Sequence, residues 1–146
     1  MSSDYLLDTS VLSSIAPGRP PLPAAVAAWL EGNDATIYLS SVTVAEIQQG
    51  VEKLRRAKGF ARADRLEGWL VEIIAQFGER LLVFDADCAR EAGRMADAAI
   101  ADGTHPGFPD VAIAATARRH GLTILTSNLR HFGPLKVPCL DPFAAG

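Results

Sequence analysis

The sequence predicts an α/β fold in which a mostly parallel sheet is wrapped by helices. Short apolar runs bounded by turn-forming residues alternate with longer segments of helical periodicity. This alternation is typical of parallel strands joined by crossover helices. The chain has 146 residues, of which 49% are hydrophobic, which is enough for the core of one domain. We therefore expect a single domain over residues 1–146.

The strands are predicted from short apolar runs that end at polar or turn-forming residues. The predicted strands are YLLD (5–8), TIYLS (36–40), LLVF (81–84), TILT (123–126) and VPCL (137–140).

Helices are predicted in the intervals between these strands. Thr9 or Ser10 can cap a short first helix that runs to about Ile15, and PGRPP then breaks it before PAAVAAWLEG. The next helix is indicated by apolar residues at helical spacing, namely Val44, Ile47, Val51 and Leu54. Further helices are expected over residues 62–77 and 85–100, and an alanine-rich helix ends before Gly121.

Composition and charge exclude several classes of protein. The 14 basic and 17 acidic residues give a net charge of -3, so a nucleic-acid partner requires a local basic patch or a metal. The N-terminal MSSDYLLDTS has no basic leader pattern, and no segment approaches the ~20 apolar residues of a membrane span. Cys88 and Cys139 lack metal-ligand spacing and are expected to be buried thiols. We expect a cytoplasmic protein without membrane contact.

Three acids are predicted to meet at one edge of the sheet. Asp8 closes the first strand, Glu46 lies in the first turns of the helix after the second, and Asp110 opens the alanine-rich helix. Pro109 suits the first position of that helix, since a proline there loses no hydrogen bond. Each acid alone has a structural explanation as a cap or dipole partner. Their common edge indicates a site, because ligands of open α/β sheets bind beyond the carboxyl ends of the strands.

The acids also indicate a metal. Three crowded carboxylates raise one another's pKa unless a divalent cation neutralises them. Ligation by oxygen without histidine or cysteine favours Mg²⁺ or Mn²⁺ over zinc. Further polar groups, Thr126, Ser127 and Asn128, follow the fourth strand at the same edge.

Gly50 lies four residues after Glu46 and therefore on the same helical face. Glycine inside a helix costs roughly 1 kcal/mol of stability relative to alanine. We therefore expect a neighbouring group to require the space that a side chain at this position would fill. Close packing against another helix is the structural explanation of such a glycine.

These motifs resemble, in order and over nearly the whole chain, those of PIN-domain ribonucleases of the VapC type, the toxins of VapBC toxin–antitoxin pairs. The resemblance rests on LLDTSVL, SSVTVAEIQQG, FPDVAIAATARRHGLTILT and TSNLRHF. It implies a three-layer α/β/α sandwich and a Mg²⁺ or Mn²⁺ site on Asp8, Glu46 and Asp110. It also implies endonucleolytic cleavage of RNA, a homodimer, and a small antitoxin that blocks the site.

The chain departs from the family pattern after the fourth strand. The family often supplies a further acid there, where this sequence has Asn128 and His131. The resemblance therefore does not extend to a second, fully charged metal site, although Asn128 can ligate through its carbonyl oxygen. His105, His120 and His131 are interpreted as surface or loop residues. His131 remains a minor candidate for the site because it follows Asn128 closely.

The ligand set suggests hydrolysis by a metal-activated water, with the metal offsetting charge on the phosphate. Thr9, Ser10 and Thr126 are candidates for orienting the carboxylates, and a helix cap or a strand-end hydroxyl explains them equally well. For RNA contact the best local patch is EKLRRAKGFARADR, although such runs are commonly solvated helix faces. Its basic residues are Lys53, Arg55, Arg56, Lys58, Arg62 and Arg65, of which Arg55, Arg56 and Lys58 are the candidate contacts.

Other functions fit less well. A haloacid-dehalogenase-type phosphatase needs a second acid two residues after Asp8, where Ser10 stands. A receiver-like domain needs paired acids after the first strand and a phospho-acceptor aspartate after the third. Asp85 and Asp87 match only the second requirement, and only weakly. The remaining alternative is a non-catalytic PIN-like module that binds RNA or protein.

Overall fold

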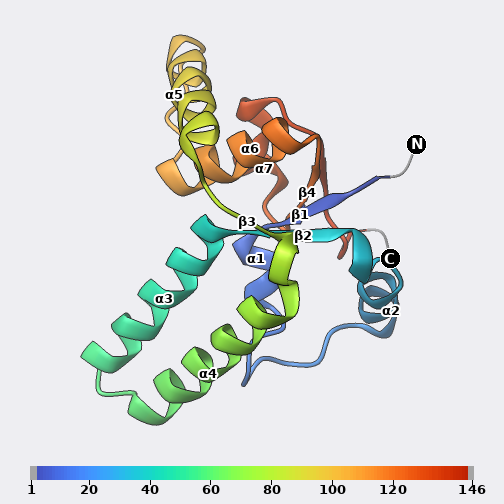
Figure 1. The fold of residues 1–146 in the computed structure, drawn as a ribbon, viewed down its shortest axis with the longest axis vertical. Helices are drawn as coiled ribbons and strands as arrows, with labels where there is room; N and C mark the ends of the chain where they lie inside the picture. The colour runs from blue at the N-terminus through green and yellow to red at the C-terminus, as the bar shows by residue number, and fades with distance from the viewer. Residues whose placement is uncertain (1–2, 145–146) are drawn as a thin grey trace.

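The computed structural model describes residues 3–144, so both ends of the predicted 1–146 domain lie outside the described residues. Its centre is a sheet of five strands in the order β3-β2-β1-β4-β5, and all four pairings are parallel (Figure 1). In the middle of the sheet, Leu6 lies opposite Tyr38 on one side and Ile124 on the other. The strands are β1 (Tyr5–Leu7), β2 (Ile37–Ser40), β3 (Leu81–Leu82), β4 (Thr123–Leu125) and β5 (Cys139–Leu140).

The five predicted strands are present but shorter than predicted. The third strand was expected over residues 81–84 and ends after Leu82. The backbone N–H of Phe84 donates a hydrogen bond to Ser41 Oγ at 2.9 Å, so the chain leaves the sheet there instead of extending the strand ladder.

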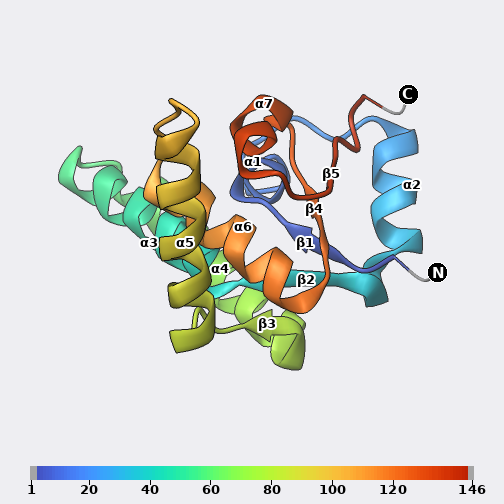
Figure 2. The same cartoon turned by 90° about the horizontal axis from the view of Figure 1, so that it is seen from above.

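Helices cover both faces of this sheet, in agreement with the predicted α/β/α sandwich (Figures 1 and 2). They are α1 (Thr9–Ser13), α2 (Ala24–Gly32), α3 (Ser41–Arg56), α4 (Phe60–Phe77), α5 (Ala86–Ala101), α6 (Phe108–His120) and α7 (Leu129–Phe132). Short 3-10 turns occupy Asp34–Thr36, Gly78–Arg80 and Gly133–Leu135.

Two helix starts and one short helix differ from the sequence predictions. The N-cap of α1 is Asp8, and neither Thr9 nor Ser10 caps it, since both lie inside the helix. Pro109 is the second residue of α6, which begins at Phe108. The short helix α7 was not predicted, because four residues carry too little periodicity to reveal it.

Two hydrophobic cores follow from the alternation of side chains along the strands. Leu6 and Ile124 point to one face of the sheet, where α5 and α6 pack. Leu7 and Leu125, the next residues along, point to the other face and meet α1, α3 and α4. The alanines of α6 are almost fully buried, which lets this helix lie close to its neighbours and fixes the position of its first turn. Gly121, with φ +66°, ends the helix in the left-handed conformation.

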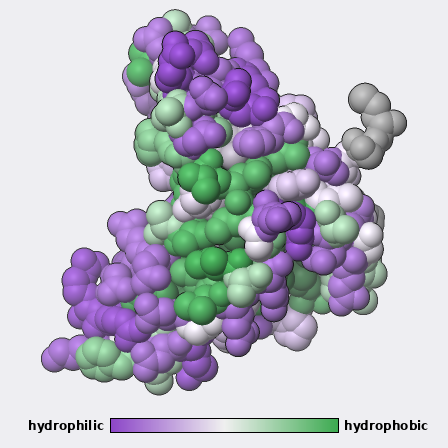
Figure 3. All heavy atoms as spheres, viewed as in Figure 1, coloured by the Kyte–Doolittle hydropathy of each residue, from purple (hydrophilic) through white to green (hydrophobic). Residues whose placement is uncertain are grey.

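The molecule has an angular outline. The α3–α4 hairpin extends from one side of the sheet and α5 projects from the other, and apolar side chains gather in the angle between them (Figures 1 and 3). Within residues 3–144, none of the helices is both long and apolar enough to cross a membrane. Both cysteines are free thiols, Cys88 being buried as predicted and Cys139 only half-buried.

Candidate functional site

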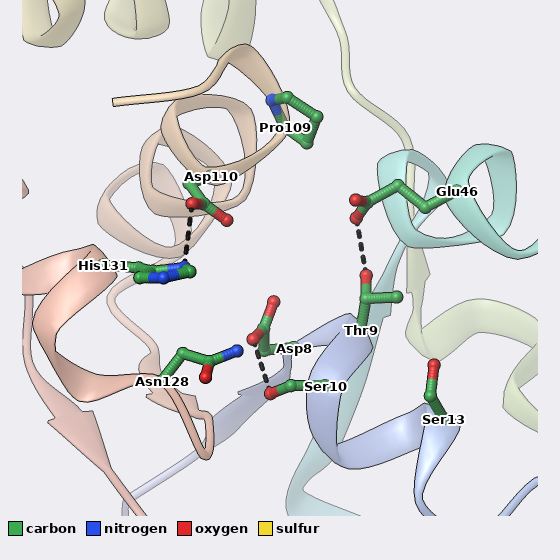
Figure 4. Close-up of a pocket in the computed structure, with 9 residues that line it drawn as sticks. All are labelled: Asp8, Thr9, Ser10, Ser13, Glu46, Pro109, Asp110, Asn128 and His131. Atoms are coloured by element: carbon green, nitrogen blue, oxygen red, sulfur yellow. Dashed lines mark hydrogen bonds and ion pairs between the residues drawn. The ribbon is translucent and has the colours of Figure 1, made fainter. Parts of the chain in front are cut away.

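A pocket of about 340 Å³ opens at the carboxyl ends of β1 and β4, where the sequence places the acids (Figure 4). Elements that are distant in sequence contribute to it: α1, α3, α6 and the segment after β4. The lining residues are Asp8, Thr9, Ser10, Ser13, Glu46, Pro109, Asp110, Asn128 and His131. The structure thus brings together all three predicted acids, from three separate elements.

Asp8 is fixed by hydroxyl groups. The residue is 5% exposed, and Ser10 Oγ and Thr126 Oγ1 each donate a hydrogen bond to Oδ2 at 2.8 Å. The backbone N–H of Asn128 donates to Thr126 Oγ1 at 2.9 Å, which holds that hydroxyl in turn. Among the described residues nothing donates to Asp8 Oδ1, so this oxygen remains available to the pocket (Figure 4).

Glu46 is held in a similar way from the opposite wall. Thr9 Oγ1 donates to Glu46 Oε1 at 2.6 Å and lies 3.1 Å from the buried Thr43 Oγ1. The first turn of α1 therefore ties the carboxylate of α3 to the end of β1. Thr9 and Ser10 lie where an orienting role requires them, although they do not cap α1.

Asp110 faces the pocket from the first turn of α6 and has a histidine partner. His131 Nδ1 lies 3.4 Å from Asp110 Oδ2 (Figure 4). The sequence interpretation of His131 as a surface or loop residue missed this contact, although His131 keeps a half-exposed side chain. Its spacing was the available signal, because His131 lies three residues after Asn128 and therefore on the same side of a helical turn.

Burial and mutual repulsion act on the acids together. Burial raises the pKa of Glu46 above its ordinary value, the hydrogen bond from Thr9 opposes the rise, and the charges of Asp8 and Asp110 add to it. Burial also raises the pKa of Asp110, Asp8 adds to the rise, and His131 opposes it. The charged forms of these acids are therefore destabilised in the folded chain, and a bound cation would remove this destabilisation.

The donor set fits a hard divalent cation. The three carboxylates offer oxygen ligands of the kind that Mg²⁺ and Mn²⁺ prefer. Asn128 also lines the pocket and turns its amide nitrogen toward Asp8, so ligation by its oxygen requires the amide group to rotate (Figure 4). In the described part of the chain, no three His, Cys, Asp or Glu side chains lie close enough together to hold an ion. The carboxylates line the pocket without converging, so binding requires their side chains to rotate inward.

The predicted RNA-contact residues lie outside this pocket. Arg55 is near the far end of α3 and forms ion pairs with Asp64 and Glu67 of α4, so its charge serves the hairpin. Arg56 lines a neighbouring hollow, and Lys58 occupies the turn between α3 and α4 with φ +64°. The ion pairs weaken the interpretation of Arg55 as a contact to RNA.

The packing explanation of Gly50 is not supported. No side-chain or backbone atom of residues 3–144, apart from its own helix, lies within 4 Å of the position where a Cβ would stand. Gly50 instead lines two hollows beside Glu46. The space beside Gly50 is therefore accessible to a ligand.

The chain resembles known proteins over almost its entire length. A family model described as the PIN domain matches residues 5–133. Over 140 residues the chain is 32% identical to VapC ribonuclease Y4jK of Sinorhizobium fredii, covering 94% of this chain and 96% of that protein. It is 35% identical to toxin FitB of Neisseria gonorrhoeae, covering 94% and 97%.

Solved structures show the same similarity. The structure of FitAcB from Neisseria gonorrhoeae superimposes with a TM-score of 0.80 at 34% identity, covering 95% of this chain and 98% of that one. A structure of FitAB bound to an IR36 DNA fragment gives a TM-score of 0.74 at 31% identity, covering 95% of each chain.

Proposed function

The chain belongs to the PIN-domain family, among the VapC-type toxin ribonucleases, and from this premise we propose that it is a Mg²⁺- or Mn²⁺-dependent endoribonuclease. It acts as the toxin of a type II toxin–antitoxin pair and hydrolyses RNA phosphodiester bonds. The observation that carries the proposal is the single pocket lined by Asp8, Glu46 and Asp110.

Each part of the pocket has a role in this proposal. Asp8, Glu46 and Asp110 hold the ion, and a Mg²⁺ or Mn²⁺ ion supplies a Lewis acid that activates water and offsets phosphate charge. Ser10 and Thr126 orient Asp8 through its Oδ2, which leaves Oδ1 for the ligand side. Outer hydrogen bonds of this kind commonly determine how well carboxylates bind a metal.

Cleavage of RNA by the purified chain tests the proposal. We expect 5′-labelled RNA to be cut in Mg²⁺, to stay intact in EDTA, and to stay intact when Asp8→Asn replaces the wild type. Undiminished cleavage in EDTA would exclude the metal mechanism. Metal binding by the wild type without cleavage of any RNA in a total cellular pool would favour the non-catalytic alternative. Mapping new RNA 5′ ends after induction in cells then identifies the substrate and the bond.

The partner is proposed to be a small antitoxin protein that covers the acidic pocket. The similar FitAcB and FitAB structures support a toxin–antitoxin pairing. A pocket lined by three carboxylates also attracts a cationic side chain, and a guanidinium can pair with a carboxylate through two hydrogen bonds.

A homodimer is the other assembly that the resemblance implies, and we place its interface in the apolar angle between α5 and the α3–α4 hairpin (Figure 3). A hollow of about 380 Å³ there is lined by Val42, Ala45, Phe84 and Phe108 among others, and Phe108 is 65% exposed. Light scattering of the isolated chain should give twice the monomer mass, and Phe108→Ser should shift the chain toward monomer. A monomeric wild type at micromolar concentration would contradict the dimer.

A further inference from the structure

A second hollow opens beside the acidic pocket and continues it. It has a volume of about 470 Å³ and shares Thr9, Ser13 and Glu46 with the acidic pocket. Its walls are the chain that follows α1 and the α3–α4 hairpin, which run beside each other in Figure 1. We call it the arginine groove, defined by Arg19, Arg62, Arg65, Ile47, Gly50 and Leu54.

The three arginines of this groove are exposed and uncommitted. Among residues 3–144, Arg19, Arg62 and Arg65 form no ion pair, and their guanidinium groups donate no hydrogen bond. Arg55 and Arg118, by contrast, pair with acids of neighbouring helices. Three free guanidinium groups around one hollow are notable in a chain of net charge -3. They make this groove a local site for anions.

Gly50 adds an observation of a different kind. It lies on the same face of α3 as Glu46 and lines the groove, with open space where a side chain would begin. A side chain there would project into the groove and not into the protein. The absence of a side chain keeps a path open from the arginines toward Glu46.

We propose that the arginine groove binds phosphate groups of the RNA strand that flanks the bond to be cleaved. This inference rests on the proposed function, because it takes RNA as the substrate. Phosphates approaching Asp8, Glu46 and Asp110 are repelled unless nearby cations offset the charge, and guanidinium groups suit phosphate oxygens. The half-buried Leu54, which lines the groove, offers an apolar surface for ribose and bases.

The experiment measures binding of an unstructured single-stranded RNA oligonucleotide to the full chain by fluorescence anisotropy. EDTA is present so that the RNA stays intact, which a gel confirms, and the salt concentration is varied. Each phosphate contact on a single strand contributes a slope of about 0.7 to log K against log[salt]. Replacing Arg19, Arg62 and Arg65 together by alanine should lower the slope by about 2 and weaken binding roughly 10- to 100-fold at 0.1 M salt.

Arg90→Ala is the matched control, because Arg90 is an exposed arginine of α5 away from both pockets. It should leave affinity and slope unchanged. Single substitutions at Arg62 and Arg65 should each lower the slope by about 0.7, which keeps the test valid if the triple variant folds poorly.

Two results would overturn the groove as an RNA site. One is a folded triple variant with wild-type RNA affinity and slope. The other is a triple variant that binds RNA normally but loses affinity for the antitoxin, which would make the groove a site for an acidic segment of that partner. Failure of the proposed function looks different: the wild type would bind RNA through the groove but leave it uncut in Mg²⁺.

Discussion

Thr9 Oγ1 donates a 2.6 Å hydrogen bond to Glu46 Oε1, which joins the first turn of α1 to the second turn of α3. The two residues are 37 positions apart in sequence, and their contact sets the direction of one of the three acids. The same hydroxyl lies 3.1 Å from Thr43 Oγ1, which is fully buried and has no other hydrogen-bond partner among the described residues. Thr9 therefore supports both the site and the core beneath it.

Replacing Thr9 by valine should weaken metal binding. The shape is kept but the donor is lost, so Glu46 is no longer oriented and its pKa rises further. We expect the Mg²⁺ concentration for half-maximal cleavage to increase about 10- to 100-fold. Stability should also fall by about 1–3 kcal/mol, because the Thr43 hydroxyl is left unpaired. Thr9→Ser keeps the donor and should behave like the wild type, and a Thr9→Val enzyme with an unchanged Mg²⁺ requirement would assign Thr9 a packing role alone.

In the metal-free protein, Glu46 and Asp110 should contribute less to stability as the pH rises through the acid range. The pKa values of Glu46 and Asp110 are raised in the folded chain, so folding favours their protonated forms. This stabilisation is complete below the unfolded pKa of ~4 and is lost as the pH rises through the folded values. In EDTA, thermal melts should show that the melting temperature of Asp110→Asn, relative to that of the wild type, increases as the pH rises from 4 to 7.

Asp97→Asn, at an exposed acid of α5, is the control for those melts and should follow the wild type. Added Mg²⁺ should recover stability at pH 7 in the wild type and not in Asp110→Asn. If the melting temperatures of all three proteins changed with pH in the same way, the neighbours of Asp110 would not raise its pKa.

Much of the fold was predictable because the motifs resemble those of a known family and because short apolar runs alternate with segments of helical periodicity. Apolar runs located the five strands, and helical spacing located the long helices. The strand ends were less predictable, because β3 stops where the Phe84 backbone turns to Ser41 Oγ. That contact joins positions 43 apart, and no local pattern encodes it.

The proximity of the three acids was predictable, and their surroundings were less so. Asp8, Glu46 and Asp110 line one pocket because strand ends and helix starts share one edge of a parallel sheet. Arg55 is paired within the hairpin, whereas Arg62 and Arg65 line the groove. A basic run in sequence does not reveal which of its members already have acidic partners, since that depends on how α3 and α4 face each other.

Gly50→Ala should separate stability from RNA binding. Alanine is favoured over glycine in a helix by about 1 kcal/mol, and no neighbouring atom opposes the added methyl group. The variant should therefore melt at a higher temperature and yet bind RNA more weakly, because the methyl group narrows the arginine groove. Gly68→Ala in α4 is the matched control, since it too has open space but lines neither pocket. It should gain stability without losing RNA affinity, and equal RNA binding by both variants would remove Gly50 from the groove.

The antitoxin is expected to compete with metal. If it inserts an arginine or lysine between Asp8 and Asp110, the cationic side chain and Mg²⁺ neutralise the same carboxylates. The apparent affinity of the antitoxin should then fall as Mg²⁺ is raised at constant ionic strength, as measured by calorimetry. An affinity that does not change over a wide range of Mg²⁺ would rule out direct insertion.

Asn128 lies at the point where the chain leaves the family pattern, and Asn128→Asp tests its part in metal binding. Its side chain lines the acidic pocket and reaches toward Asp8, while its neutral amide leaves the pocket one negative charge short of a four-acid arrangement (Figure 4). Metal affinity depends on the number of charged ligands, so the aspartate should lower the Mg²⁺ concentration needed for half-maximal cleavage.

The maximal rate of Asn128→Asp need not rise with occupancy. A cation shared by more anionic ligands polarises water less, and the added charge repels the RNA backbone. Mg²⁺ titrations of cleavage by the wild type and Asn128→Asp, run side by side, separate the two effects as a shift in midpoint and a change in plateau. Identical midpoints would place Asn128 outside the metal site and leave Asp8, Glu46 and Asp110 as its protein ligands.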